Sequence, residues 1–172
     1  MKKLKPNGVK LLKVFHLLFA IMWICGAIAL ILGMYIATAD TGDELYMKLR
    51  MLQVIDDWII IPGANGCLLT GIIYGIWTNW GFFKYRWLTV KWILTVIQML
   101  FGTFFLGVWL NGSVEIAGSL RDTAFSNSQL IYYTQMISIW GLAQLGLLLL
   151  YIVISVYKPW KKKKSISIQA TS

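Results

Sequence analysis

Four long apolar segments constrain the fold of this 172-residue chain more than any other feature of its sequence. A helix needs about 20 mainly apolar residues to cross a bilayer, whereas the strands of a membrane barrel are about half as long and alternate in polarity. Only 13% of the residues are charged and 58% are hydrophobic. The sequence therefore predicts an all-α membrane protein, a single domain (1–172) whose four transmembrane helices form an antiparallel bundle. The predicted spans are 11–38, 53–77, 88–110 and 130–157.

The distribution of charge predicts how these spans are oriented. The 16 basic residues lie near the N-terminus, between the second and third spans, and in the tail 158–172, with the exceptions of Lys48, Arg50 and Arg121. The seven acidic residues lie on the opposite side of the membrane or just inside it. By the positive-inside rule, both termini are expected in the cytoplasm. The basic tail is expected to contact anionic lipids, and this placement argues against nucleic acid as a partner.

The segments outside the membrane are predicted to be short. The two outer loops, 39–52 and 111–129, are the only sizeable pieces expected outside the membrane, and the second is polar and too short to form a domain. Cys25 and Cys67 both lie within apolar runs and are expected to be small buried side chains rather than a disulfide pair. Close contacts between helices are expected at small residues, namely Gly26, Gly33, Gly71, Gly75, Gly102, Gly141 and Gly146.

The only histidine, His16, lies five residues past Leu11, where the first span begins. Lys91 lies five residues past Arg86, where the third span begins at the same membrane face. Both are thus expected about 7–8 Å deep in one leaflet, where they can face each other. Neutral imidazole is the commonest metal ligand, and a desolvated lysine can offer a lone pair. The two could bracket a heme iron, or Lys91 could bind a carboxylate.

The helical neighbours of His16 suit a flat macrocycle, because a small residue lies beside a large aromatic one. These neighbours are Lys13, Phe19, Ala20 and Trp23. Two simpler interpretations stay open at this point. Lys91 could extend to the membrane surface, and His16 could form a hydrogen bond with a neighbouring helix.

A second group of polar residues occupies the second span. Asp56, Asn65, Thr70 and the break at Pro62 could line a polar path through the membrane. The alternative is an interfacial helix start, where an aspartate is stabilised by the helix dipole. Pro62 leaves one backbone carbonyl without its helical donor, and Asn65 is a candidate to satisfy that carbonyl.

The remaining polar residues of the spans are predicted to stabilise the bundle through hydrogen bonds between helices. They are Gln98, Gln135, Gln144 and Ser138. The sequence has no nucleotide-binding glycine loop, no His/Cys cluster, and no Ser/His/Asp set, because its one histidine lies within a span.

Several stretches resemble HemJ, the membrane protoporphyrinogen oxidase of many bacteria. "LLKVFHLLFAIMWICGAIAL" is similar to its first helix, with Lys13, His16 and Trp23 in place, and "YRWLTVKWIL" is similar to the start of its third helix. The second span, with Pro62 and Gly71, and the closing "ISVYKPW" also fit. The pattern equally resembles copper resistance protein D and uncharacterised bacterial four-helix membrane proteins. "MISIWGLAQLG" lacks the Asn-Glu-x-Pro of the HemJ fourth helix.

The resemblance implies a b-type heme in the bacterial cytoplasmic membrane. It implies His16 as a ligand, Lys91 as second ligand or propionate partner, and Trp87 near the heme. Electron transfer or porphyrinogen oxidation would be the chemistry. A small permease, for copper or another solute, is the alternative, with Cys25, Cys67 and Met22 as a thin set of copper ligands. A non-catalytic assembly subunit is a third, and formation of homo-oligomers stays open.

Overall fold

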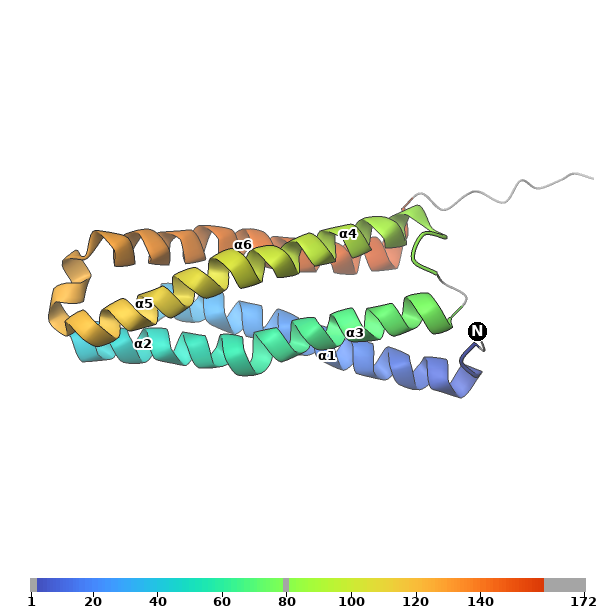
Figure 1. Cartoon of the computed structure of the whole chain (residues 1–172), viewed down its shortest axis with the longest axis horizontal. Helices are drawn as coiled ribbons and strands as arrows, with labels where there is room; N and C mark the ends of the chain where they lie inside the picture. Colours follow the sequence, from blue (N-terminus) through green and yellow to red (C-terminus); the bar gives the residue numbers. More distant parts are fainter. Residues whose placement is uncertain (1–2, 79–80, 160–172) are drawn as a thin grey trace, which may run out of the picture.

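The structure is a computed structural model, and it describes residues 3–78 and 81–159. Four long helical segments lie side by side, and successive segments run in opposite directions (Figure 1). Most of the basic tail that is expected to contact anionic lipids, including Lys161 to Lys164, lies outside the described residues. The elements are α1 (Pro6–Ile36), α2 (Gly42–Ile55), η1 (Asp56–Ile60), α3 (Ile61–Trp77), α4 (Arg86–Phe101), η2 (Gly102–Leu106), α5 (Gly107–Leu120), η3 (Arg121–Ser126) and α6 (Ser128–Tyr157).

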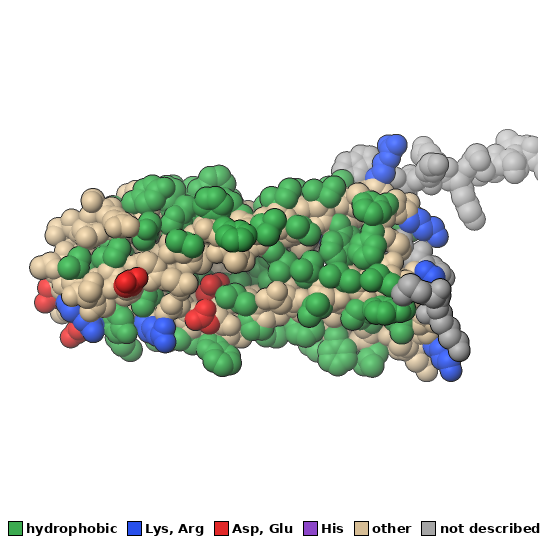
Figure 2. Space-filling view, viewed as in Figure 1, with side chains coloured by type: hydrophobic (Ala, Val, Ile, Leu, Met, Phe, Trp, Pro, Cys, Tyr) green, Lys and Arg blue, Asp and Glu red, His purple; other side chains and the backbone are tan. Residues whose placement is uncertain are grey.

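Within the described residues, all four long helical segments are long and apolar enough to cross a membrane. This confirms an all-α fold with four helices able to span a membrane. Exposed hydrophobic side chains cover the middle of the bundle, and charged side chains gather towards its two ends (Figure 2). Such a surface matches a hydrocarbon solvent, because apolar side chains facing lipid have no need to be buried against one another.

The helices extend well beyond the predicted spans, so the expectation of outer loops at 39–52 and 111–129 is wrong. The segment from Gly42 to Trp77 has 36 residues and is therefore about 54 Å long. The hydrocarbon core of a bilayer is only about 30 Å thick. The bundle thus continues past its apolar band at the end where α2, α5 and η3 meet (Figure 1).

Local sequence signals explain this helical extension. Thr41 and Glu44 form a capping box that starts α2, and Asn127 caps α6 by accepting a hydrogen bond from the Leu130 amide. Buried apolar side chains then pack α2, α5 and α6 together. They are Leu49, Val114, Ala117, Ala124 and Leu130. The polar residues that suggested loops in these two segments lie on the solvent-facing sides of amphipathic helices.

Two short π-helices, η1 and η2, interrupt the middle of the second and third long segments. The amide of Ile61 bonds to the carbonyl of Asp56, five residues earlier. Pro62 follows directly, and it has no N–H and clashes with an ordinary helical carbonyl. The wider π-helical turn accommodates this proline without breaking the helix. Asn65 donates to the carbonyl of Ile61 at 2.9 Å, which is not one of the carbonyls four or five residues before Pro62 that this proline can leave without a donor.

The α1–α3 interface is an antiparallel seam built on two glycines. A Cβ at Gly63 would lie 2.7 Å from the backbone nitrogen of Trp23, and one at Gly66 would lie 2.2 Å from the Phe19 ring. The two helices therefore approach as closely as backbone allows, as small residues permit in membranes. The expected contact role of Gly102 and Gly146 is wrong, since a Cβ there would meet nothing within 4 Å.

The two cysteines differ in their surroundings. Cys67 is buried, as predicted, whereas Cys25 is exposed on the outer face of α1, so the expectation of a buried Cys25 is wrong. Both are free thiols. The helical phase explains the difference, because Cys25 lies two residues from Trp23 and so falls on another side of the helix.

Candidate functional site

His16 and Thr70 meet at the next turn of the α1–α3 seam, directly beyond the Phe19–Gly66 contact. The Nδ1 atom of His16 lies 2.8 Å from Oγ1 of Thr70. The single hydroxyl hydrogen of Thr70 is used towards the carbonyls of Gly66 and Cys67, at 2.6 and 3.1 Å. Thr70 must therefore accept from His16. The proton of a neutral imidazole is thus on Nδ1, and its lone pair is on Nε2.

The surroundings of the ring are partly aromatic and partly polar. Tyr74 contacts the His16 ring edge-on, with the ring centroids 5.9 Å apart. The Cys67 thiol lies 3.8 Å from the carbonyl oxygen of His16. The ring also has a hydrogen bond with the backbone of Cys67. With the proton on Nδ1, Nε2 carries the lone pair that could coordinate a ligand.

Lys91 also points into the bundle rather than towards the membrane surface. Its Nζ atom donates to Oγ of Ser155 on α6 at 2.5 Å, and the Ser155 hydroxyl in turn donates to the carbonyl of Tyr151. Lys91 lies within electrostatic range of both His16 and Cys67. The two residues that the sequence paired are thus on neighbouring interior faces, each bonded to a hydroxyl of a different helix.

The other residues predicted around a heme are placed differently. Trp23 and Trp87 are buried, and Ala20 is partly buried against the core around Trp23. Lys13 is exposed on the surface of α1. The structure therefore brings Ala20 and Trp23 to the interior side of the helix and leaves Lys13 outside.

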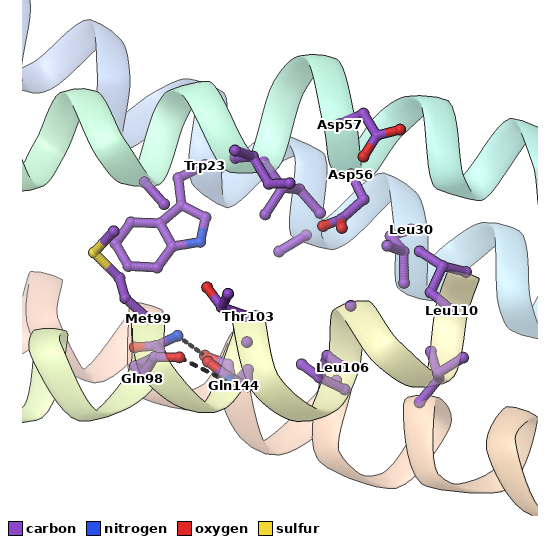
Figure 3. A pocket seen from close by; sticks show the side chains of 18 of the residues that line it. Trp23, Leu30, Asp56, Asp57, Gln98, Met99, Thr103, Leu106, Leu110 and Gln144 are labelled. Atoms are coloured by element: carbon purple, nitrogen blue, oxygen red, sulfur yellow. Dashed lines mark hydrogen bonds between the residues drawn. The ribbon is translucent and has the colours of Figure 1, made fainter. Parts of the chain in front are cut away.

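A cavity lies in the middle of the bundle, lined by residues that follow His16 on α1 from Trp23 onward. Its volume is about 550 Å³, and α1, η1, α3, α4, η2, α5 and α6 all contribute to its walls (Figure 3). Trp23 and Met99 lie together at one end of the cavity, and Leu110 lies at the other (Figure 3). Neither His16 nor Lys91 lines it. The cavity is therefore a second site, distinct from the His16–Thr70 pair.

Polar groups line this cavity on opposite walls. Asp56 and Asp57 come from η1, while Gln98, Thr103 and Gln144 come from the facing helices (Figure 3). Of the predicted polar path, Asp56 and Asn65 line the cavity, whereas Pro62 and Thr70 do not. Asp56 is partly buried and has no hydrogen-bond or ion-pair partner in the described part of the chain.

The predicted hydrogen bonds between helices are confirmed for one pair. Gln98 of α4 donates to the carbonyl of Gln144 at 3.0 Å, and Gln144 of α6 donates to the carbonyl of Gln98 at 3.3 Å. The side-chain oxygen of Gln98 is buried without a partner. Ser138 instead donates to the carbonyl of Thr134 in its own helix, so its predicted role between helices is wrong.

Sequence reasoning missed the two π-helices and, with them, Thr103 and Gly102 as lining residues. Both π-helices contribute residues to the cavity wall. Pro62 was a local signal for η1, but η2 has no proline, and only the paired glycines Gly102 and Gly107 mark it. Single π-turns inside α-helices are frequent at functional sites. Their position around the cavity therefore supports it as a binding site.

No group of three or more His, Cys, Asp or Glu residues that could hold a metal ion occurs within residues 3–78 and 81–159. A heme iron takes most of its ligands from the porphyrin and needs only one or two side chains. Comparison with protein-family models, with curated proteins and with solved structures finds no match for this chain. The candidate sites are consequently argued from their own geometry.

Proposed function

We propose that this chain is an integral protein of the bacterial cytoplasmic membrane that binds a b-type heme through Nε2 of His16. The observation that supports the proposal most is the bond from Nδ1 of His16 to Thr70. A metal-binding histidine usually donates its other ring N–H to a neighbouring acceptor, which sets the tautomer and orients the ring. Thr70 provides this acceptor from inside the bundle.

The residues present fit a heme in two further respects. Lys91 uses one ammonium proton towards Ser155, so its other protons are available for a propionate carboxylate. Ala20 and Trp23 follow His16 on the interior side of α1, in the packed core around Trp23, and a heme at His16 would lie next to a small and a flat apolar side chain. In this proposal Lys91 acts as a propionate partner rather than as an iron ligand, because its nitrogen already bonds to Ser155.

The heme, when bound, would supply one-electron redox chemistry, which includes the porphyrinogen oxidation or electron transfer implied by the resemblance. The chain would provide the rest. Thr70 keeps the proton of His16 on Nδ1, the α1–α3 seam fixes the ring in the membrane, and Lys91 balances negative charge beside it.

Absorption spectroscopy of the detergent-purified chain tests this proposal. The chain is expressed with ample heme, and the wild type is compared with His16→Ala and His16→Asn. The amide nitrogen of an asparagine can replace Nδ1 as the donor to Thr70, but it provides nothing in place of Nε2. Both variants are expected to lose the heme Soret band if Nε2 binds iron.

The asparagine variant separates the proposed role from a purely structural one. If His16 only holds α1 to α3, His16→Asn will keep the folding stability and any spectrum of the wild type. A colourless wild-type protein, or a His16→Ala variant with an unchanged heme spectrum, overturns the proposal. A stable, colourless protein that copurifies with another membrane protein would instead favour an assembly subunit.

The central cavity favours a second candidate function, a small-solute permease. Asp56 and Asn65 line it within the part of the bundle that carries the apolar band. Met99 is the one sulfur-containing side chain among its lining residues, so the cavity offers poor ligands for copper. Solute uptake into vesicles by the wild type, lost in Asp56→Asn, tests this candidate.

A further inference from the structure

The residues that line the central cavity include negative charges and no positive charge. Two carboxylates, Asp56 and Asp57, are among its lining residues, and no lysine, arginine or histidine is among them. The other lining side chains are neutral. We propose that this cavity is a binding site for a monovalent organic cation, a molecule with an amine or onium group on an apolar body. The proposal deepens the second candidate function by naming its ligand class, and it is independent of heme binding.

Asp56 provides the charge that such a cation would balance. Its carboxylate is partly buried in the middle of the bundle and makes no hydrogen bond or ion pair with the described residues. An ionised carboxylate inside a membrane is costly unless it is paired. An organic cation bound in the cavity compensates that cost directly, because it brings the missing positive charge to Asp56.

Gln98 provides an independent indication of a polar ligand. Its side chain is only 3% exposed, and its oxygen is buried without a partner although its nitrogen bonds to Gln144. A buried acceptor that lacks a donor usually has an ordered ligand or water beside it. Gln98 and Asp56 lie on opposite walls of the cavity (Figure 3). A ligand with an N–H group can therefore reach an acceptor on either wall.

The remaining lining selects an organic cation over a metal ion. Most of the wall is apolar, and a volume of about 550 Å³ falls within the range of small-molecule sites, about 300–1,000 Å³. A bare cation would need several oxygen ligands converging at short distance, and among the described residues no group of three or more His, Cys, Asp or Glu could hold a metal ion. Trp23 at one end of the cavity adds an aromatic face that favours cations.

The cavity has access from the side of the bundle. α3 packs chiefly on α1, and α4 packs on α6. Between the described parts of α3 and α4 there is no comparable packing, although the Trp92 ring reaches Gly71 nearer the basic end. The surface is hollowed between these two layers, beside acidic side chains (Figure 2). An amphipathic cation could therefore enter from the lipid phase.

Equilibrium binding of two probe cations to the full chain in detergent tests the proposal. Ethidium carries N–H groups and is followed by fluorescence anisotropy, and tetraphenylphosphonium carries none and is followed by equilibrium dialysis. Asp56→Asn keeps the side-chain size but removes the charge, and it is expected to weaken both probes at least tenfold. Glu115→Gln removes an exposed charge of α5 that does not line the cavity, and less than a twofold change is expected.

Two further variants examine the geometry of the site. Gly102→Leu places a side chain in the open space of the cavity, where a Cβ meets nothing within 4 Å, and it is expected to block both probes without unfolding the chain. Gln98→Leu is expected to weaken ethidium more than tetraphenylphosphonium, since only ethidium can donate to Gln98.

The outcomes separate this proposal from the heme site and from transport. His16→Ala is expected to bind both probes like the wild type, so a failed heme test leaves the cavity proposal standing. Binding without uptake into vesicles would reject the permease and keep the binding site. A wild type that binds neither probe, or an Asp56→Asn variant with unchanged affinity for both, overturns the proposal.

Discussion

Gln98 and Gln144 bind each other's backbone across the α4–α6 interface, each side chain donating to the other's main-chain carbonyl (Figure 3). The pair closes one wall of the central cavity and joins the third and fourth long helices within the apolar band. Reciprocal bonds of this kind fix both the height and the rotation of two helices, because neither helix can slide without breaking both of them.

Replacing Gln144 tests how much this pair stabilises the bundle. Gln144→Leu removes one interhelical hydrogen bond, and bonds of this type in membranes contribute about 0.6–2 kcal/mol. We expect a loss of about 1 kcal/mol in the free energy of unfolding, measured by denaturation in mixed detergent micelles. Gln135→Leu, at an exposed position of the same helix, is the control. Equal stability of the Gln144→Leu variant and the wild type would show that the pair is energetically neutral.

The α1–α3 seam predicts a large difference between two glycine substitutions. A methyl group at Gly63 would lie 2.7 Å from the backbone nitrogen of Trp23, which cannot move aside. We expect Gly63→Ala to destabilise the chain by about 1–3 kcal/mol, the usual cost of overpacking. Gly102→Ala meets open space, and it is expected to be neutral or to stabilise by up to about 1 kcal/mol through helix propensity. If both substitutions lower the thermal unfolding midpoint equally, the close packing of α1 against α3 at Gly63 is contradicted.

The helical extension outside the apolar band has its own test at Gly42. The amide of Gly42 donates to Asp122 at 2.6 Å, and a Cβ at Gly42 would lie 2.2 Å from the carbonyl carbon of Arg121. Gly42→Ala should therefore separate α2 from η3. We expect faster hydrogen exchange in residues 42–55 and 111–126, with the protection of α1 unchanged.

Gly118→Ala is the matched control for this extension. Its Cβ would lie 3.2 Å from the Tyr46 ring, a side chain that can move. Its exchange profile should therefore stay close to that of the wild type. The amide hydrogens of a polar loop exchange without any local unfolding. Complete exchange of residues 111–126 in the wild type would therefore contradict a folded extension.

The orientation predicted from charge is tested by cysteine labelling. In a background with Cys25→Ala and Cys67→Ala, single substitutions Lys10→Cys and Glu115→Cys place one thiol near each end of the bundle. The positive-inside rule predicts that a membrane-impermeant maleimide reaches position 115 in intact cells. Position 10 should react only after the membrane is opened. The reverse pattern would place both termini outside the cytoplasm.

The predicted spans follow from the sequence by itself, because crossing a bilayer requires only a sufficient run of apolar residues. Composition also indicated that His16 and Lys91 lie within these spans. The sequence could not tell which neighbour each would bond, since that depends on how the helices are rotated and shifted against one another. Cys25 illustrates the point, for an apolar run does not say which of its faces meets lipid.

Only the tertiary structure decided those rotations. Gly63 and Gly66 set the register of α1 against α3, and this register brings His16 to Thr70 rather than to Lys91. The widened turns at η1 and η2 both line the central cavity, and Asp56 and Gln98 lie on opposite walls of it. Apolar content determines that a segment enters the membrane, but close packing between helices determines which polar groups meet there, because packing depends on the shapes of surfaces far apart in the chain.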